Sequence, residues 1–471
     1  MNSVLNLVKP KWTSHALPRL APCLAVFLVF LALFAVAPAI AQVPEASPPA
    51  TPKIDSGDTA WMLVSTALVM LMTPGLALFY GGMVRAKNVL NMLMQSFVAL
   101  GIVTIIWVLW GYSLAFSPGN PFIGGLEWFG LLKGVSQDPS SYAPTIPHSV
   151  YMIYQMMFAV ITPALISGAL AERMKFSTYV VLVALWVTLV YCPIAHWVWG
   201  QGGWLGKLGV LDFAGGTVVH ISSGVSALVV AILLGKRNVG HSTADELRPH
   251  NLPMTLIGTA LLWFGWFGFN AGSAVSSGGL AGSAFVATHI AAAVAGLTWT
   301  MIEWKAYKKP TALGFATGAV AGLVAITPAA GYVGPLAAIV IGAGVACVSF
   351  FAIKLKHVFK FDDTLDVFGV HGVGGMFGAV MTGLFASKLI NSAGADGLFY
   401  GGGFTLVGKQ FVAIGASAGY AALVTFVLIK ALGATMGLRV KKEEEDAGLD
   451  LTQHGEAGYS NMETGGGMSE G

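Results

Sequence analysis

Two histidines lie inside hydrophobic stretches, where ionisable side chains are rare. His220 ends the sequence Asp212-Phe-Ala-Gly-Gly-Thr-Val-Val-His220, and His371 ends Asp366-Val-Phe-Gly-Val-His371. If a helix begins near Asp212, His220 lies roughly 12 Å along it, a depth at which an ionisable group in a membrane is usually functional. Two neutral imidazoles can share a proton through their ring nitrogens. The pair therefore points to proton handling inside an apolar path.

Other interpretations of these residues remain open at this point. A single buried histidine is more often a hydrogen-bonded packing residue, and two histidines without nearby cysteines or carboxylates are too few ligands for a metal site. Asp212 is expected to cap its helix and to add negative potential that favours a cation. Asp366 is expected to cap the helix of His371 in the same way.

Aromatic residues and one serine could form a site for a small cation. Trp266, Phe269 and Ser273 are spaced three and four residues apart, so they share one helix face. Trp199 and Phe158 are expected to reach the same outer level from two other spans. Aromatic faces attract cations by about 0.5 to 2 kcal/mol, although such a stripe is more often packing or an interfacial belt.

The elements that carry these residues are membrane-spanning helices. The 471-residue chain is 55% hydrophobic and 10% charged, and its apolar residues come in runs of about twenty. We expect an all-α polytopic membrane protein in which eleven helices within 58–433 form two inverted five-helix repeats plus one extra helix, with a pore through each subunit. The expected spans are approximately 59–82, 91–116, 148–170, 177–198, 213–234, 253–273, 280–302, 311–328, 333–353, 364–387 and 405–433.

The chain ends and the placement of positive charge predict the orientation. Residues 1–41 are typical of a cleaved signal peptide, although an uncleaved anchor helix is the alternative, and 42–57 would be a disordered external lead-in. Of the 25 Lys and Arg residues, 17 fall on one side of the predicted spans and five on the other. This bias predicts a multi-pass protein of the inner (plasma) membrane, with the mature N-terminus outside and a cytoplasmic tail, 434–471. The tail is either a partner surface or a solvated segment.

Several long motifs resemble those of the ammonium transporter (Amt/MEP/Rh) family, and the resemblance, to a bacterial Amt-type member, covers essentially the whole mature chain. Beside the two histidine stretches, the matching segments are Thr73-Pro-Gly-Leu-Ala-Leu-Phe-Tyr-Gly-Gly82, Arg85 to Asn88, Gly168-Ala-Leu-Ala-Glu-Arg173, Gly265-Trp-Phe-Gly-Phe-Asn-Ala-Gly-Ser273 and Gly437-Leu-Arg-Val440.

The resemblance implies roles for individual residues. Phe158, Trp199 and Ser273 match the family's external ammonium site, and Phe158 with Phe269 matches its phenyl gate. His220 and His371 match the pore histidines, Trp266 matches an aromatic that lines the pore, and Asp212 matches the aspartate under the vestibule. Upstream of Phe158 this chain departs from the family, because Tyr154-Gln-Met-Met stands where many relatives carry a phenylalanine and small residues.

The resemblance also implies a homotrimer, in many bacterial members blocked by a PII-type protein at the cytoplasmic face. The expected function is ammonium transport: the cation is recruited outside, deprotonated, and crosses as ammonia while the histidine pair handles its proton. The alternatives are an ammonium sensor that signals through a cytoplasmic partner and a neutral-ammonia channel. An enzyme is not expected, since the sequence carries no nucleophile–base pair or metal cluster, and neither a cofactor nor nucleic acid is expected.

Overall fold

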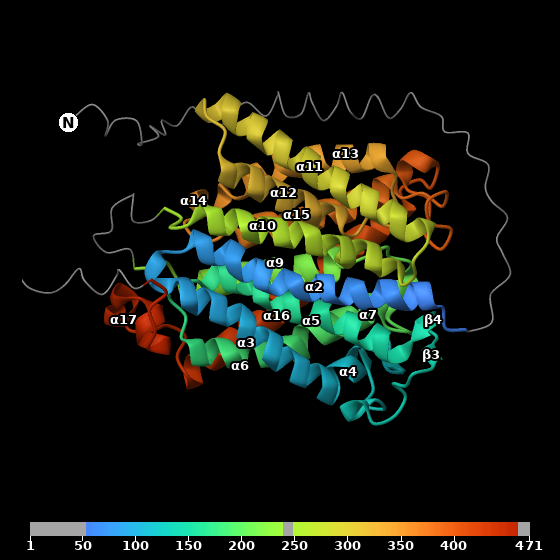
Figure 1. The fold of residues 1–471 in the computed structure, drawn as a ribbon, viewed down its shortest axis with the longest axis horizontal. Coiled ribbons are helices and arrows are strands. Elements are labelled where there is room, and N and C mark those ends of the chain that lie inside the picture. The colour runs from blue at the N-terminus through green and yellow to red at the C-terminus, as the bar shows by residue number, and fades with distance from the viewer. Residues whose placement is uncertain (1–52, 239–247, 460–471) are drawn as a thin grey trace, which may run out of the picture. The chain divides into compact units, whose positions relative to one another are not determined.

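The computed structural model describes residues 53–238 and 248–459, and helices make up most of this part of the chain (Figure 1). The expected signal peptide, 1–41, and most of the expected lead-in, 42–57, lie outside the described residues. The first described helix, α2, begins at Ser56, and Asp55 caps it by accepting a hydrogen bond from the Asp58 N–H at 2.8 Å. This carboxylate satisfies a backbone donor that has no partner within the helix.

The first half of the described chain consists of long helices and one connection with two short hairpins. In order its elements are α2 (Ser56–Met83), η2 (Ala86–Asn88), α3 (Val89–Ile106), η3 (Trp107–Gly111), α4 (Tyr112–Phe116), β1 (Gly119–Asn120), β2 (Ile123–Gly124), η4 (Phe129–Leu131), β3 (Pro139–Ser140), β4 (Ala143–Pro147), α5 (His148–Leu170), α6 (Phe176–Trp186), η5 (Val187–Tyr191), α7 (Cys192–Trp199), α8 (Trp204–Leu208), η6 (Gly216–Ile221) and α9 (Ser222–Leu234). Both hairpins, β1–β2 and β3–β4, are antiparallel.

The second half repeats the pattern of long helices joined by short turns. Its elements are α10 (Leu252–Trp266), η7 (Phe267–Ala271), η8 (Gly272–Ala274), α11 (Gly279–Tyr307), α12 (Ala312–Ile326), α13 (Pro335–Ala352), α14 (Leu355–Val358), η9 (Phe368–Gly372), α15 (Val373–Phe385), η10 (Leu398–Tyr400), α16 (Thr405–Thr435), α17 (Lys442–Ala447) and η11 (Asp450–His454).

Ten helical stretches of the described residues are long and apolar enough to cross a membrane, which confirms the predicted class of fold. The eighth of the eleven predicted spans, 311–328, forms α12, whose 15 residues extend only about 22 Å, so the count of eleven is not reached by helix length alone. Protein surrounds α12, because α10, α11, α13 and α15 all pack against it. A helix enclosed in this way does not need to match the full thickness of the hydrocarbon core.

Glycines allow neighbouring helices of the bundle to approach one another closely. Gly258 on α10 faces α2 so tightly that a Cβ there would lie 2.2 Å from the backbone nitrogen of Phe79. Likewise, a Cβ at Gly224 on α9 would lie 2.2 Å from the backbone nitrogen of Gly372. Small residues at helix contacts are the usual means of packing in membranes, where van der Waals contact replaces the hydrophobic effect.

The two helices that carry the histidines run in opposite directions. The π-helical turn η6 packs against α15, the helix that follows η9, while η9 packs against α9, the helix that follows η6. Each histidine therefore lies in a wide helical turn, His220 beside α15 and His371 beside α9. Such π-turns are rare and occur frequently at functional sites.

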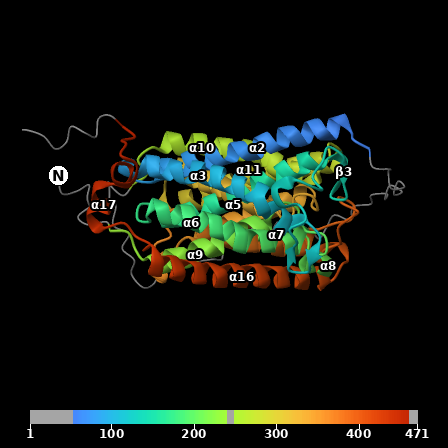
Figure 2. The ribbon, with the colours of Figure 1, turned by 90° about the horizontal axis from the view of Figure 1, so that it is seen from below.

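The C-terminal segment packs against the loops at one end of the helices. The carboxylate of Asp450 accepts hydrogen bonds from the N–H groups of Leu90 and Asn91 at 3.0 and 2.8 Å, and the Leu449 N–H donates to Asn88. We call the surface that carries α17 and η11 the tail-bearing face. The strand β3 lies at the opposite end of the helices (Figure 2).

Candidate functional site

Three aromatic rings from separate helices form a column toward the middle of the protein. The ring of Phe158 on α5 lies 4.2 Å from that of Phe269 on η7, centroid to centroid, with 33° between their planes. On its other side, Phe158 meets Trp199 at the end of α7, with centroids 6.0 Å apart and planes nearly perpendicular. Phe158 and Phe269 are both 1% exposed, so this pair of rings closes the path.

Trp199 is held in place by a backbone oxygen. Its indole Nε1 donates a hydrogen bond to the carbonyl of Asp212 at 2.9 Å, which ties the ring to the segment that leads into η6. The side chain is partly exposed, unlike the rings below it. Trp199 therefore presents a fixed aromatic surface at the open end of the column.

Ser273 is joined to this column through Tyr154. The Tyr154 hydroxyl lies 3.2 Å from Ser273 Oγ and 2.9 Å from the carbonyl oxygens of Gly268 and Phe269, and its ring contacts that of Phe158. The Ser273 hydroxyl donates to the carbonyl of Phe269 at 2.8 Å. Because its hydrogen is used in this way, the Ser273 oxygen can act only as a hydrogen-bond acceptor toward other groups.

The two histidines lie directly against each other below the phenyl rings. Nδ1 of His371 is 3.2 Å from Nδ1 of His220, and the two rings stack at a centroid distance of 5.3 Å. At this distance one Nδ1 must donate and the other must accept, so the two neutral rings adopt different tautomers. Nε2 of His220 is buried and has no hydrogen-bond partner among the described residues.

Trp266 forms one wall beside the histidines. Its ring stacks on His220 with centroids 5.5 Å apart and 21° between the planes, and it contacts Phe269 at the same centroid distance. The indole Nε1 donates to the Thr327 hydroxyl at 2.9 Å, which satisfies the one polar group of this side chain.

The space between these side chains is very small and almost entirely apolar. A cavity of about 10 Å³ lies at the histidines, enough for roughly one water-sized molecule. Its walls come from seven elements of the bundle, and the lining residues are Met72, Leu76, Phe79, Ile161, Leu165, Val219, His220, Leu262, Trp266, Phe269, Val320 and His371. A hydrated cation does not fit here, and the two imidazoles and the indole are the only polar groups of this wall.

Asp212 fixes the start of the first histidine helix. Its carboxylate accepts hydrogen bonds from the N–H groups of Gly215, Gly216 and Thr217 at 2.8, 2.6 and 2.8 Å, and from the hydroxyl of Thr217. The side chain is 6% exposed, so these donors replace the water that it would otherwise bind. The expectation that Asp212 caps its helix agrees with this geometry.

The cap of the second histidine helix is Asp363 rather than the expected Asp366. The Asp363 carboxylate accepts hydrogen bonds from the N–H groups of Val367 and Phe368 at 3.1 and 2.8 Å. Asp366 instead turns away with a φ of 60° and pairs with Lys356 at 2.5 Å. Burial, together with the nearby Asp366 carboxylate, raises the pKa of Asp363 to about 6.

The structure therefore brings most of the predicted site residues into one path. Trp199, Phe158, Phe269, Trp266, His220 and His371 form a continuous series of ring contacts. Asp212 caps the turn that carries His220, and its carbonyl accepts the hydrogen bond from Trp199. Ser273 reaches this path through Tyr154. Sequence reasoning missed Thr327 and Asp363, and it noted Tyr154 only as a departure from the family pattern. Asp363 could have been found, because it precedes His371 by the same eight residues that separate Asp212 from His220.

Comparisons with known proteins agree with this geometry. Residues 60–459 match the model of the Ammonium Transporter Family. The chain is 57% identical over 404 residues to an ammonium transporter of Bacillus subtilis, covering 86% of this chain and 98% of the relative. It is 49% identical over 410 residues to the ammonium transporter Amt1 of Archaeoglobus fulgidus, covering 86% and 100%.

Solved structures of the same kind superpose on the chain. The crystal structure of Saccharomyces cerevisiae Mep2 matches with a TM-score of 0.77 at 40% identity, covering 83% of this chain and 89% of the other. A structure described as a sensor Amt protein matches with a TM-score of 0.76 at 28% identity, covering 84% and 98%. With a path closed by aromatic rings and a buried histidine pair inside a helical membrane bundle, this chain belongs to the ammonium transporter family.

Proposed function

We propose that the protein recruits the ammonium cation at Phe158, Trp199 and Ser273, removes one proton, and conducts ammonia past His220 and His371. The observation that carries this proposal is the contact between the two Nδ1 atoms at 3.2 Å in a cavity of about 10 Å³. Such a cavity cannot hold a hydration shell, and an unpaired ion in an apolar path costs far more free energy than cation–π contacts return. Loss of the proton removes that cost.

The histidine pair supplies a base in the right place. If the Nδ1–H of His220 donates to His371, then Nε2 of His220 carries a free lone pair, and this buried atom has no partner among the described residues. It can accept a hydrogen bond from ammonia or a proton from ammonium. Stacking between Trp266 and Phe269 then holds the ring in that orientation.

The test is electrical. Purified protein in liposomes on a solid support should give a current after an ammonium jump, and His220→Leu and His371→Leu should each reduce it strongly. His357→Leu, which changes an exposed histidine on α14, is the matched control and should leave the current unchanged. Parental currents and uptake in both pore variants would remove the histidines from the mechanism. Repeating the jump under a pH gradient tests whether the proton crosses with ammonia.

Two rival functions make different predictions. A neutral-ammonia channel has no use for the cation site, so Trp199→Ala and Ser273→Ala would leave uptake unchanged at low pH, where ammonium predominates. An ammonium sensor would fail to restore growth of a permease-deficient host on limiting ammonium despite surface expression. The neighbour described as a sensor Amt protein makes this second alternative worth testing.

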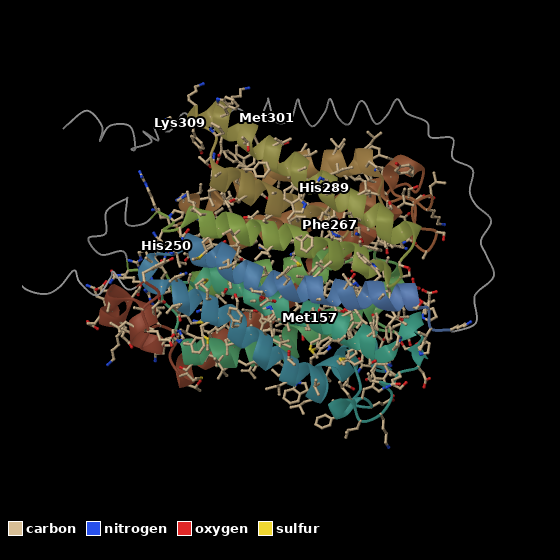
Figure 3. All side chains as sticks on the ribbon, in the orientation of Figure 1. Met157, His250, Phe267, His289, Met301 and Lys309 are labelled. Carbon is tan, nitrogen blue, oxygen red and sulfur yellow. The ribbon has the colours of Figure 1, made fainter. Side chains whose placement is uncertain are left out.

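We further propose that the protein is a homotrimer and that the face formed by α10 and α11 is its subunit interface. His289 lies ten residues into α11, roughly 15 Å along it, and is exposed on this face near Phe267 and Phe285 (Figure 3). A histidine at that depth is costly against lipid. A second copy packed against α11 would bury it, so His289→Glu should shift the mass of the purified protein from trimer to monomer.

The remaining proposals concern the membrane and a partner. The excess of Lys and Arg beside the tail-bearing face supports its placement in the cytoplasm, with the protein in the inner (plasma) membrane. Cleavage of 1–41 would make Gln42 the first residue of the mature protein, which N-terminal sequencing can test.

A PII-type regulatory protein would dock on the tail-bearing face, and purified PII-type protein should then bind the parent but not a chain truncated after Lys441.

A further inference from the structure

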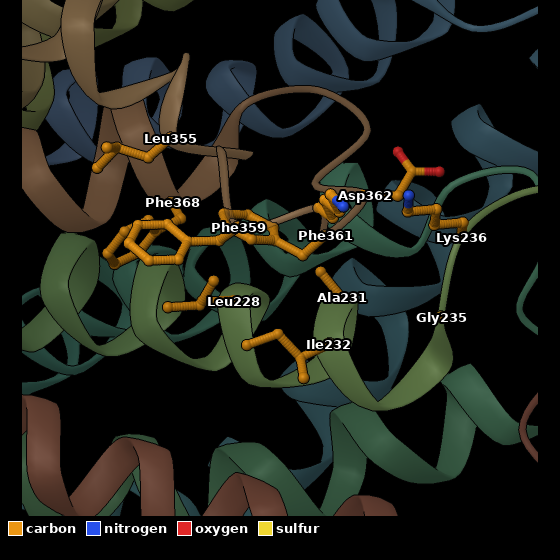
Figure 4. Close-up of a pocket in the computed structure, with 11 residues that line it drawn as sticks. Leu228, Ala231, Ile232, Gly235, Lys236, Leu355, Phe359, Phe361, Asp362 and Phe368 are labelled. Carbon is orange, nitrogen blue, oxygen red and sulfur yellow. The ribbon is translucent and has the colours of Figure 1, made fainter. Parts of the chain in front are cut away.

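A second cavity, separate from the pore, lies between α9 and the segment that joins α13 to η9. Its volume is about 420 Å³, and Figure 4 shows the side chains that line it. Leu228 and Ile232 on α9 form one wall, while Phe359 and Phe368 lie across from them. The space is large enough for several carbon atoms of a chain, and the walls that these four residues form are apolar.

The cavity reaches into the part of the protein that spans the membrane. The α9 span ends at Leu234, so Leu228 lies six residues, or roughly 9 Å, inside it. Ile232 is 57% exposed on the outer surface of the helix. A chain that entered beside Ile232 would therefore come from the hydrocarbon layer and not from the aqueous phase.

Positive charge marks the other end of the same cavity. Lys236 and Lys360 line it just beyond the end of the span, and neither lysine forms an ion pair within the described ranges 53–238 and 248–459. The one carboxylate in the lining, Asp362, is already engaged by Arg237 through hydrogen bonds of 2.9 and 3.2 Å. The rim is therefore cationic and open to an anion.

The segment beside the cavity, 355–360, has the composition of protein segments that lie at a membrane surface. Leu355, Val358 and Phe359 are 38, 69 and 70% exposed. Lys356 follows Leu355 in the sequence, and Lys360 follows Phe359. Large exposed apolar groups among lysines are typical of segments that rest at the boundary of a bilayer. Figure 2 shows α9 and α16 on the side away from α2 and α10.

We infer that the cavity binds an anionic phospholipid, with one acyl chain between Leu228 and Phe359 and the phosphate held by Lys236 and Lys360. This inference rests on the proposed membrane orientation, which places the lysines in the anionic leaflet. It does not depend on the transport mechanism, because binding is measured without transport.

The test titrates purified full-length protein in detergent with phosphatidylglycerol or phosphatidylcholine and counts bound lipids by native mass spectrometry. Each lysine near an anionic lipid contributes a factor of about five in affinity. The double variant Lys236→Gln/Lys360→Gln should therefore bind phosphatidylglycerol roughly 25-fold more weakly, with phosphatidylcholine binding unchanged. The matched control is Lys308→Gln/Lys309→Gln, exposed lysines at the end of α11, of which Lys309 is labelled in Figure 3.

A second variant separates the acyl site from surface charge. Leu228→Trp fills the apolar wall and should lower retention of phosphatidylglycerol while leaving the thermal unfolding of the protein close to that of the parent. Equal losses in the control pair, equally tight binding of phosphatidylcholine, or full retention of phosphatidylglycerol in Leu228→Trp would each overturn the inference. None of these results would alter the currents on which the pore mechanism depends.

Discussion

Asp363 caps the helix turn that carries His371 from eight residues upstream, just as Asp212 caps the turn that carries His220. Because the two helices run in opposite directions, the caps lie at opposite ends of the bundle. Each histidine is thus positioned by a buried carboxylate near a different face of the protein. The two caps can be tested separately, since burial raises the pKa of Asp363 to about 6.

The first prediction concerns pH. The pKa of Asp363 is raised by burial and by Asp366 to about 6, above its ordinary 3.8, so the folded protein binds this proton more tightly than the unfolded chain. The stabilisation from this group is complete below about pH 4 and is lost as the pH rises through about 6. Asp363→Asn removes this dependence, so the Tm of the variant minus that of the parent should be higher at pH 7.5 than at pH 5, by on the order of a few degrees.

Asp362→Asn is the control for that measurement, because its carboxylate lies next in sequence but burial is outweighed by Arg237, which lowers its pKa. Its Tm difference from the parent should not change between pH 5 and 7.5. A Tm difference for Asp363→Asn that is the same at both pH values would contradict the raised pKa.

The second prediction concerns the hydroxyl of Tyr154. Tyr154→Phe removes the contacts with Ser273 Oγ and with the carbonyls of Gly268 and Phe269, which leaves the serine less firmly placed. We expect weaker ammonium recruitment, by about 1 kcal/mol or roughly fivefold in the half-saturating concentration, with a smaller change in maximal current. Tyr191→Phe is the matched control, since the buried Tyr191 hydroxyl has no partner among the described residues.

The third prediction concerns the support of Trp266. Thr327→Val keeps the shape of the side chain but removes the acceptor of the indole N–H, so a buried donor loses its hydrogen bond at a cost of about 1–3 kcal/mol. We expect a lower Tm together with a reduced ammonium current, because the ring that stacks on His220 is no longer held. Thr317→Val, elsewhere on α12, should change neither by a comparable amount, since Thr317 bonds only to its own helix.

The fourth prediction concerns the tail. Asp450→Ala removes the cap from the N–H groups of Leu90 and Asn91, and a lost cap costs about 1 kcal/mol. Amide exchange in residues 442–454 should accelerate roughly fivefold, as measured by hydrogen–deuterium exchange. Glu443→Ala alters an exposed carboxylate of α17 and should leave that exchange unchanged. If both variants exchange like the parent, the tail is held by other contacts.

The sequence predicts the fold to the extent that hydropathy determines it. Long apolar runs such as 148–170 reappear as helices with nearly the same bounds, whereas 311–328 forms a helix too short to be recognised by length. Its burial among four other helices is a property of the assembled bundle. The π-turns at both histidines are not among the sequence predictions, which place each histidine in an ordinary helix.

The site was predictable where residue type alone fixes the chemistry. His220, His371 and the aromatic rings stand out in an apolar background, and their approach within the pore agrees with that reasoning. The supporting polar groups do not stand out. A carboxylate such as Asp450 in a charged tail looks like any solvated residue, and Thr327 gains its role only from a tryptophan 61 positions away. The sequence predicts Asp366 as the cap of the His371 helix, but the positive φ of Asp366 turns its backbone away from the helix, and Asp363 is the residue that caps it.

The size of the cavity at the histidines has a consequence for the order in which molecules could cross the protein. If ammonia crosses here as we propose, a cavity with room for one small molecule would make the molecules pass in single file, so that none could overtake another. On that mechanism, labelled ammonia moving in and unlabelled ammonia moving out would compete for the same space. An amine too bulky to leave the cavity would then occupy it and inhibit transport of the smaller molecule.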